Sequence, residues 1–377
     1  MKSFFKRSVI SIVVLGMAGS GYAAMSQHNQ YVSNNSSWCP QVSGAFIGVE
    51  GLVLRPSNGD LDYVTLFPTT TTGYFNTDSI SPSYHWGWRV YGGLKITDND
   101  DLTLSWMQLN TSQSDSVSPA GSLGFNVSAP RFITLDPANW SNVHGRATFD
   151  LRDAYAVWGH TIYFKNPWSV RFAGGVEWAK IDSDLTVTAN TGPVPDGVIG
   201  LFPINTALGY EAKSQTKGIG PRIEMDLTYH LPYGFALFGN ANGALLVSTR
   251  DISLEALTPI VTTLAGDVSF FGSDYSNRHV VIPKFGARLG VSYSYVWGQA
   301  GGEGCRTTTL MVDAGWQVES FIHAIERPDE GFFGGGDIEP GLVQLPFSTT
   351  GTFANTKVSN FGDQGLFIGI QVGTDWM

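Results

Sequence analysis

The chain has 377 residues, of which 13% are aromatic and 14% charged, and it carries a formal net charge of −10 at pH 7. An acidic chain does not suit a nucleic acid or an anionic lipid surface as partner, because both are bound through basic patches. Many glycines and aromatic rings with few charges favour a twisted all-β chain over a helical one. Two cysteines are too few to provide a disulfide framework.

The N-terminus has the pattern of a secretory signal. Three basic residues among the first seven precede an apolar run at 9–17, and small residues follow at Gly21 and Ala23. We predict a signal peptide over 1–23, cut after Ala23. The alternative, a transmembrane anchor, is disfavoured because the apolar run has about half the ~20 residues that a helical span requires. Residues 24–43 are polar and are expected to form a periplasmic leader.

From residue 44 onward, ten stretches alternate apolar and polar side chains, which is the period of a β-strand. The last stretch is the clearest, with Leu366, Ile368 and Ile370 on one face and Gly369 and Gln371 on the other. An apolar face that ends in Trp suits lipid. The ten stretches are 45–55, 86–96, 102–107, 148–164, 170–178, 219–231, 235–248, 281–295, 310–318 and 365–376.

Two of these stretches fit the pattern poorly. In 45–55 the alternation is blurred by Leu52 and Leu54. In 148–164 an acidic residue, Asp153, intrudes on the apolar face, while Arg152 lies on the opposite one. We expect a β-bulge in the second stretch.

The connections between the strands alternate between long and short. An outer-membrane β-barrel shows this asymmetry, with short periplasmic turns and long extracellular loops. We therefore predict an all-β, closed antiparallel transmembrane β-barrel over 44–377, with about 10 strands (12 or more possible) and both termini at the periplasmic side. A soluble β-sandwich is the alternative. Aromatic residues near the predicted strand ends favour the barrel, namely Tyr229, Tyr233, Tyr295, Trp297, Trp168, Trp376, Trp86 and Trp178.

Three short motifs carry a family resemblance. They are Trp38-Cys39-Pro40 leading into Gly44-Ala-Phe-Ile-Gly48, Trp86-Gly-Trp-Arg89, and the closing Phe367-Ile-Gly-Ile-Gln-Val-Gly373. On these motifs and the layout of its strands, the chain resembles the Legionella-type major outer membrane protein family, which is pore-forming. The resemblance implies a channel in the bacterial outer membrane, with no particular solute. It supplies no catalytic or binding residue.

The faces opposite the apolar ones are predicted to line the barrel lumen. They carry basic and acidic residues in equal number, either as paired ladders that close the lumen or as opposed walls of a water-filled pore. Asp150 and Arg152 are assigned to this lining as well. The other predicted lumen-lining residues are Arg89, Lys95, Arg171, Glu177, Arg222, Glu224, Asp226, Lys284, Arg288, Asp313, Glu319 and Asp375.

The predicted function is a porin-like protein for passive diffusion of ions or small polar solutes, without cofactor, metal or enzymatic activity. One alternative is a structural or adhesin-type barrel with a closed lumen. A less favoured alternative is an outer-membrane protease, with Asp274 and His279 near the rim together with His85 or His144. No HExxH motif or paired histidine spacing indicates zinc.

The predicted partners follow from the membrane location. They are outer-membrane lipid and lipopolysaccharide, the barrel-assembly machinery acting on the strand at 365–376, and a possible second copy of the chain, with no nucleic acid. Because an exported protein meets an oxidising compartment, Cys39 and Cys305 form a possible disulfide. Two free thiols, or bridges between barrels, are the alternatives.

Overall fold

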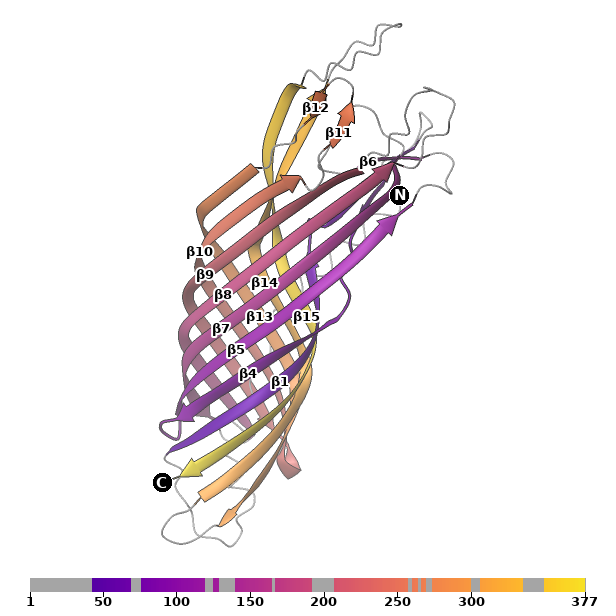
Figure 1. The fold of residues 1–377 in the computed structure, drawn as a ribbon. Coiled ribbons are helices and arrows are strands. Elements are labelled where there is room, and N and C mark those ends of the chain that lie inside the picture. Colours follow the sequence, from indigo (N-terminus) through magenta and orange to yellow (C-terminus); the bar gives the residue numbers. More distant parts are fainter. Residues whose placement is uncertain are drawn as a thin grey trace, which may run out of the picture.

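Ten antiparallel strands form one closed barrel in the computed structural model (Figure 1). The structure describes residues 43–68, 76–118, 125–128, 140–164, 167–191, 207–256, 260–263, 266–268, 273–299, 306–334 and 349–376. The predicted signal peptide, the leader to residue 42 and both cysteines lie outside these residues. The barrel strands are β1 (Ser43–Asn58), β4 (His85–Lys95), β5 (Asp100–Val117), β7 (Trp140–Tyr163), β8 (Trp168–Thr191), β9 (Ala207–His230), β10 (Phe235–Ala256), β13 (Ser273–Gln299), β14 (Arg306–Gly334) and β15 (Thr349–Trp376).

The first and last barrel strands close the ring. β1 pairs with β15 on one side and with β4 on the other, so that Val49 lies opposite both Ile370 and Val90. This pairing joins the strands predicted at 45–55 and 365–376, as the predicted closed barrel requires. Closure leaves no unpaired edge among the ten barrel strands, which is how a sheet avoids exposing backbone N–H and C=O groups.

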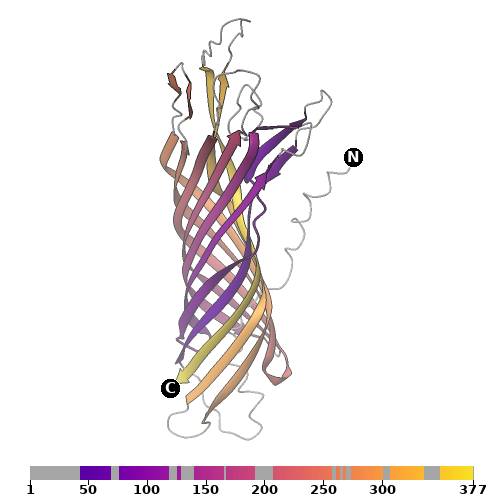
Figure 2. The ribbon, with the colours of Figure 1, turned by 45° about the vertical axis from the view of Figure 1, so that its right-hand side comes forward.

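The two ends of the barrel differ. Short connections at 96–99, 164–167 and Pro232–Gly234 lie at one end, here called the turn end, where β15 also finishes beside the start of β1 (Figure 1). At the opposite end, here called the loop end, consecutive barrel strands are separated by longer stretches of sequence. Five short strands form two small sheets there (Figure 2), namely β2 (Asp62–Pro68), β3 (Asn76–Ser79), β6 (Phe125–Ser128), β11 (Ile260–Thr263) and β12 (Gly266–Val268).

A collar of apolar side chains surrounds the outside of the barrel at its turn-end half. Ile223 is 72% exposed, and Leu366, Ile370 and Val291 are 50–52% exposed. A β-sandwich would bury these residues between two sheets, so their exposure excludes that alternative. The collar comprises outward residues such as Val49, Val90, Leu104, Phe172, Val176, Ile219, Ile223, Leu237, Val247, Leu289, Val291, Val312, Leu366, Ile368 and Ile370. Among the described residues, no helix is long and apolar enough to cross a membrane.

Beyond the collar, the polarity of the two faces is reversed. On β8, Val176 points outward within the collar, but farther along the strand Ile181 and Leu185 are buried inside. Lys180 and Asp182 now occupy the outer face. The barrel strands therefore continue past the collar with a polar exterior and an apolar interior, and they are longer than the sequence predicted.

This reversal explains why two of the predicted stretches fitted the alternating pattern poorly. Leu52 and Leu54 are fully buried inside the barrel, although earlier residues of β1 such as Val49 point outward. On β7 the apolar residues Phe149 and Leu151 face the interior together with Asp153. The predicted bulge is wrong, because the ladders of β7 with β5 and β8 run through Asp153 without a register shift.

Candidate functional site: the barrel lumen

Charged side chains fill the lumen at the level of the collar. Strand alternation brings one residue in two to the interior. On two pairs of neighbouring strands it places an acid directly opposite a base, namely Glu50 opposite Arg89 and Arg171 opposite Asp226. We call this set the charge belt. It consists of Glu50, Arg89, Asp101, Asp153, Arg171, Glu177, Arg222, Glu224, Asp226, Lys284, Arg288, Asp313, Glu319 and Asp363.

Lys284 of β13 connects three other strands across the lumen. Its ammonium group contacts Asp153 of β7, lies 2.6 Å from Glu177 of β8 and lies 3.0 Å from Glu319 of β14. The side chain has no exposed surface. In the order of the ring, β7 is four strands away from β13, so these contacts reach across the interior.

A second group of contacts joins the opposite wall. Glu50 of β1 accepts hydrogen bonds from Arg89 of β4 and Arg288 of β13, both at 2.8 Å. Arg89 also lies 3.5 Å from Glu319, a partner of Lys284. The two groups of contacts therefore share a carboxylate.

The third group lies on β5, β8 and β9. The guanidinium of Arg171 donates two hydrogen bonds to Asp101, at 2.7 and 2.6 Å, and one to Asp226 at 2.7 Å. Arg222 donates to Glu224 and to Glu177, at 2.9 and 2.6 Å. Because Glu177 also binds Lys284, the three groups form one network. Such pairing offsets the desolvation penalty of burying charge.

Most predicted lumen residues lie in the belt. Lys95 instead lies at the turn end, and the side chain of Asp375 is outside the described residues. Asp150 and Arg152 were assigned to the lumen wrongly. They form a 2.7 Å ion pair on the outer face of β7, because the faces of that strand are reversed beyond the collar.

Four acidic members of the belt were missed, namely Glu50, Asp101, Asp153 and Asp363. Glu50 could have been found, since it alternates with Val49 on a predicted strand. Asp101 comes directly before the predicted strand at 102–107, and Asp153 was predicted to intrude on an outward apolar face. With these additions, carboxylates outnumber cations in the belt.

An apolar layer fills the interior on the loop-end side of the belt. Phe361 of β15 packs against Phe149 of β7 and Phe321 of β14, with ring centroids 5.5 and 6.1 Å apart. Leu52 and Leu54 lie in the same cluster, and all five side chains are at most 2% exposed. We call this layer the apolar plug. Charge belt and apolar plug together occupy the lumen over most of its length.

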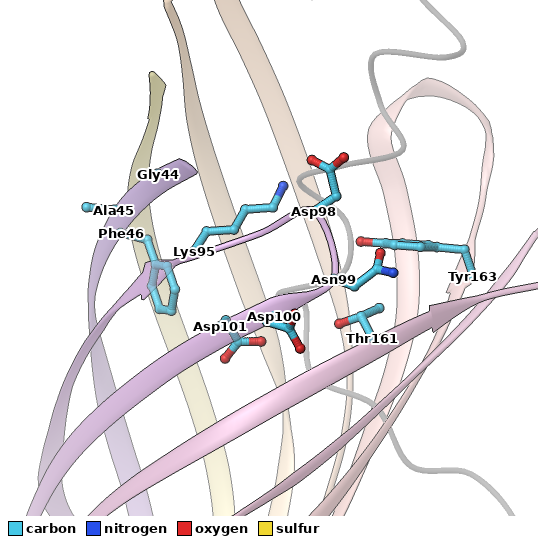
Figure 3. Close-up of a pocket in the computed structure, with 10 residues that line it drawn as sticks. All are labelled: Gly44, Ala45, Phe46, Lys95, Asp98, Asn99, Asp100, Asp101, Thr161 and Tyr163. Atoms are coloured by element: carbon cyan, nitrogen blue, oxygen red, sulfur yellow. The ribbon is translucent and has the colours of Figure 1, made fainter. Parts of the chain in front are cut away.

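A small cavity of about 30 Å³ lies at the turn end (Figure 3). Lys95 of β4 lines it together with Asp98 of the turn and with Asp100 and Asp101 at the start of β5. The turn is fixed to β7 by a backbone hydrogen bond from Thr161 to Asn99 at 2.7 Å. A cavity of this size holds about one water molecule.

The residues considered for a protease do not form one cluster. His144 and His279 point outward on β7 and β13, and Asp274 lies near the loop end of β13. His85 lies on β4, at hydrogen-bond distance from Ser83. In the part of the chain that the structure describes, no group of His, Cys, Asp and Glu is arranged to hold a metal ion.

Comparison with known proteins yields one strong match. A family model described as Legionella pneumophila major outer membrane protein precursor matches residues 39–374. No curated protein matches the chain. Among solved structures, the outer membrane protease OmpT from Escherichia coli is similar at 9% identity and a TM-score of 0.35, covering 91% of this chain and 99% of that one. The toluene transporter TodX from P. putida is similar at 9% identity and a TM-score of 0.28, covering 89% and 90%.

Proposed function

The chain belongs to the Legionella major outer membrane protein family, and on this premise we propose that it is a gated pore of the outer membrane. The charge belt holds the lumen closed, and small ions pass when its ion pairs exchange partners. Because carboxylates outnumber cations in the belt, cations pass more readily than anions.

The membrane orientation follows from the two ends of the barrel. In outer-membrane barrels, short turns face the periplasm and long loops face the exterior. The turn end is accordingly periplasmic and the loop end extracellular. The apolar collar spans the hydrocarbon layer. Aromatic pairs lie at its periplasmic border, such as Trp168 and Tyr229, whose ring centroids are 4.6 Å apart.

The observation that carries the proposal is the sharing of partners at Lys284. One ammonium group binds three carboxylates, Asp153, Glu177 and Glu319, from three strands. A group with several partners can leave one of them without becoming an unpaired buried charge, which would otherwise cost several kcal/mol. Exchange between partners therefore gives a low-energy route for opening the lumen.

A second candidate function is a structural barrel with a permanently closed lumen. The apolar plug favours it, because Phe149, Phe321 and Phe361 fill the interior beyond the belt and offer an ion no polar contact. The two candidates differ in one measurable property, the conductance of the reconstituted protein.

The test is planar-bilayer recording of the refolded barrel and of a Lys284→Met variant. Without the ammonium group, the three carboxylates repel one another, so we expect openings at least about tenfold more frequent than in the wild type, with cation preference. Lys357→Met is the matched control, since that lysine is 43% exposed at the loop end. It should leave the opening frequency unchanged.

Folding is checked by the heat-dependent shift in gel mobility that barrels show. If folded wild-type protein and the folded Lys284→Met variant both lack conductance steps at every salt concentration, the pore is rejected and the structural barrel remains. If Lys357→Met increases openings as much as Lys284→Met, the belt is not the gate.

A further inference from the structure

Three cations lie side by side on the outer face of the barrel. Arg152 of β7 is opposite Lys180 of β8, and Lys180 is opposite Lys217 of β9. We call these residues the cation row. Neighbouring strands are about 4.8 Å apart, so like charges in direct register repel one another and destabilise the sheet.

The cation row lies directly at the loop-end edge of the apolar collar. The preceding outward row consists of Ala154, Trp178 and Ile219, again opposite one another on the same three strands. Trp178 stacks on Trp106 with ring centroids 5.8 Å apart. Because Trp side chains mark the level of lipid headgroups, the cation row lies at the headgroup level of the outer leaflet.

Two of the cations pair with a carboxylate on their own strand. Arg152 lies 2.7 Å from Asp150, and Lys180 lies 2.5 Å from Asp182. In the sequence the acid comes first on β7 and second on β8. Since the two strands are antiparallel, the cation is nearer the collar in both cases. Ion pairing alone is indifferent to this order, so the order needs another cause.

We propose that the cation row binds the phosphate groups of an anionic glycolipid in the outer leaflet of the outer membrane. Arg and Lys donate charge-assisted hydrogen bonds to phosphate, and a bridging anion turns the repulsion within the row into attraction. The acidic net charge of the chain disfavours contact with anionic lipid on average. The register of β7, β8 and β9, however, brings three cations together at the level of the lipid headgroups. The inference rests on the membrane placement proposed above and not on conductance.

The test compares two triple variants of the full barrel, refolded in detergent. The first is Arg152→Gln, Lys180→Gln, Lys217→Gln. The matched control removes three cations farther from the collar, Arg146→Gln, Lys213→Gln, Lys357→Gln. The first two lie on the outer face, and Lys357 is 43% exposed at the loop end. Native mass spectrometry measures the occupancy of lipid A with two phosphates and of the same lipid after dephosphorylation.

We expect the first triple variant to bind the phosphorylated lipid at least about tenfold more weakly than wild type, and the control to stay within about twofold. All three proteins should bind the dephosphorylated lipid alike. The single variant Lys217→Gln, at an exposed position, should show a smaller loss of the same kind and serves if the triple variant does not refold.

Equal loss in both triple variants, or undiminished binding in the first, would overturn the inference, since binding would then depend on total charge or on acyl chains. Conductance recorded on the same samples keeps the two proposals separate. A variant that loses lipid but conducts as wild type supports the lipid site whatever the outcome for the pore.

Discussion

At the scale of single residues, the charge belt depends on glycines as much as on charges. Gly159 of β7 faces the lumen against Arg171 of β8, and a Cβ atom there would overlap the guanidinium group. Gly369 of β15 lies in the same way against Asp313 and Glu50. These positions leave room for long charged side chains to cross the lumen, which a narrow ten-stranded barrel would otherwise lack.

A substitution at Gly159 tests this role. We expect Gly159→Ala to destabilise the folded barrel by about 1–3 kcal/mol, the usual cost of overpacking, because Arg171 must leave Asp101 or Asp226. Equilibrium unfolding in urea from lipid vesicles measures the difference. Gly174→Ala on β8 is the control, since its nearest neighbour is the Arg222 carbonyl oxygen at 4.0 Å. Equal destabilisation in both variants would show that the lumen at Gly159 is not tightly packed.

At the scale of the strand, the informative feature is the level at which polarity reverses. Leu52 and Leu54 blurred the pattern of β1 because the strand crosses this level between Val49 and Leu52. A period of two persists along the whole strand, but the apolar residues change face. Strand positions and pairing could therefore be predicted from the sequence, while the face of Asp150 and Arg152 could not. Assigning the apolar face to the outside along a whole strand assumes that the same medium surrounds the strand from end to end, and here it does not.

The reversal predicts a position-dependent cost of charge on the outer face of β9. Ile223→Arg, in the middle of the collar, should destabilise the barrel by about 2–4 kcal/mol, and Gln215→Arg, outside it, by about 0–1 kcal/mol. Both residues point outward on one strand, so the comparison isolates the surrounding medium. The measurement is the free energy of folding into vesicles. Similar costs at both positions would place residue 215 in lipid and contradict the assigned height of the collar.

At the scale of the whole molecule, closure of the ring is the condition for everything else. A bilayer provides no water for unpaired backbone groups, so an open sheet with this collar would be unstable in lipid. Alternation along each strand made a closed barrel predictable. The ion pairs across the lumen could not be predicted, because the stagger of all ten strands determines which charged side chains meet. Lys284 and Asp153, for instance, are 131 residues apart in the chain.

The seam between the first and last strands can be tested covalently. In a Cys39→Ser, Cys305→Ser background, cysteines at Val49 and Ile370 should form a disulfide, because these residues are directly opposite. Opposite Cα atoms are about 4.5–5.5 Å apart, within the range of a disulfide. The control pair, Val49→Cys with Ile368→Cys, is diagonal at about 7–8 Å and should stay reduced.

The cross-link is seen as faster migration of the heat-denatured protein on a non-reducing gel, because it closes most of the chain into a loop. Formation in membranes with the first pair alone requires that β1 and β15 meet in this register in the lipid-inserted state. If the diagonal pair forms the bond equally well, the seam slips by two residues. The stagger of the ring would then change, and with it the alignment of Glu50 with Arg89 and Arg288. The seam thus connects the pairing of two strands to the arrangement of charges that closes the lumen.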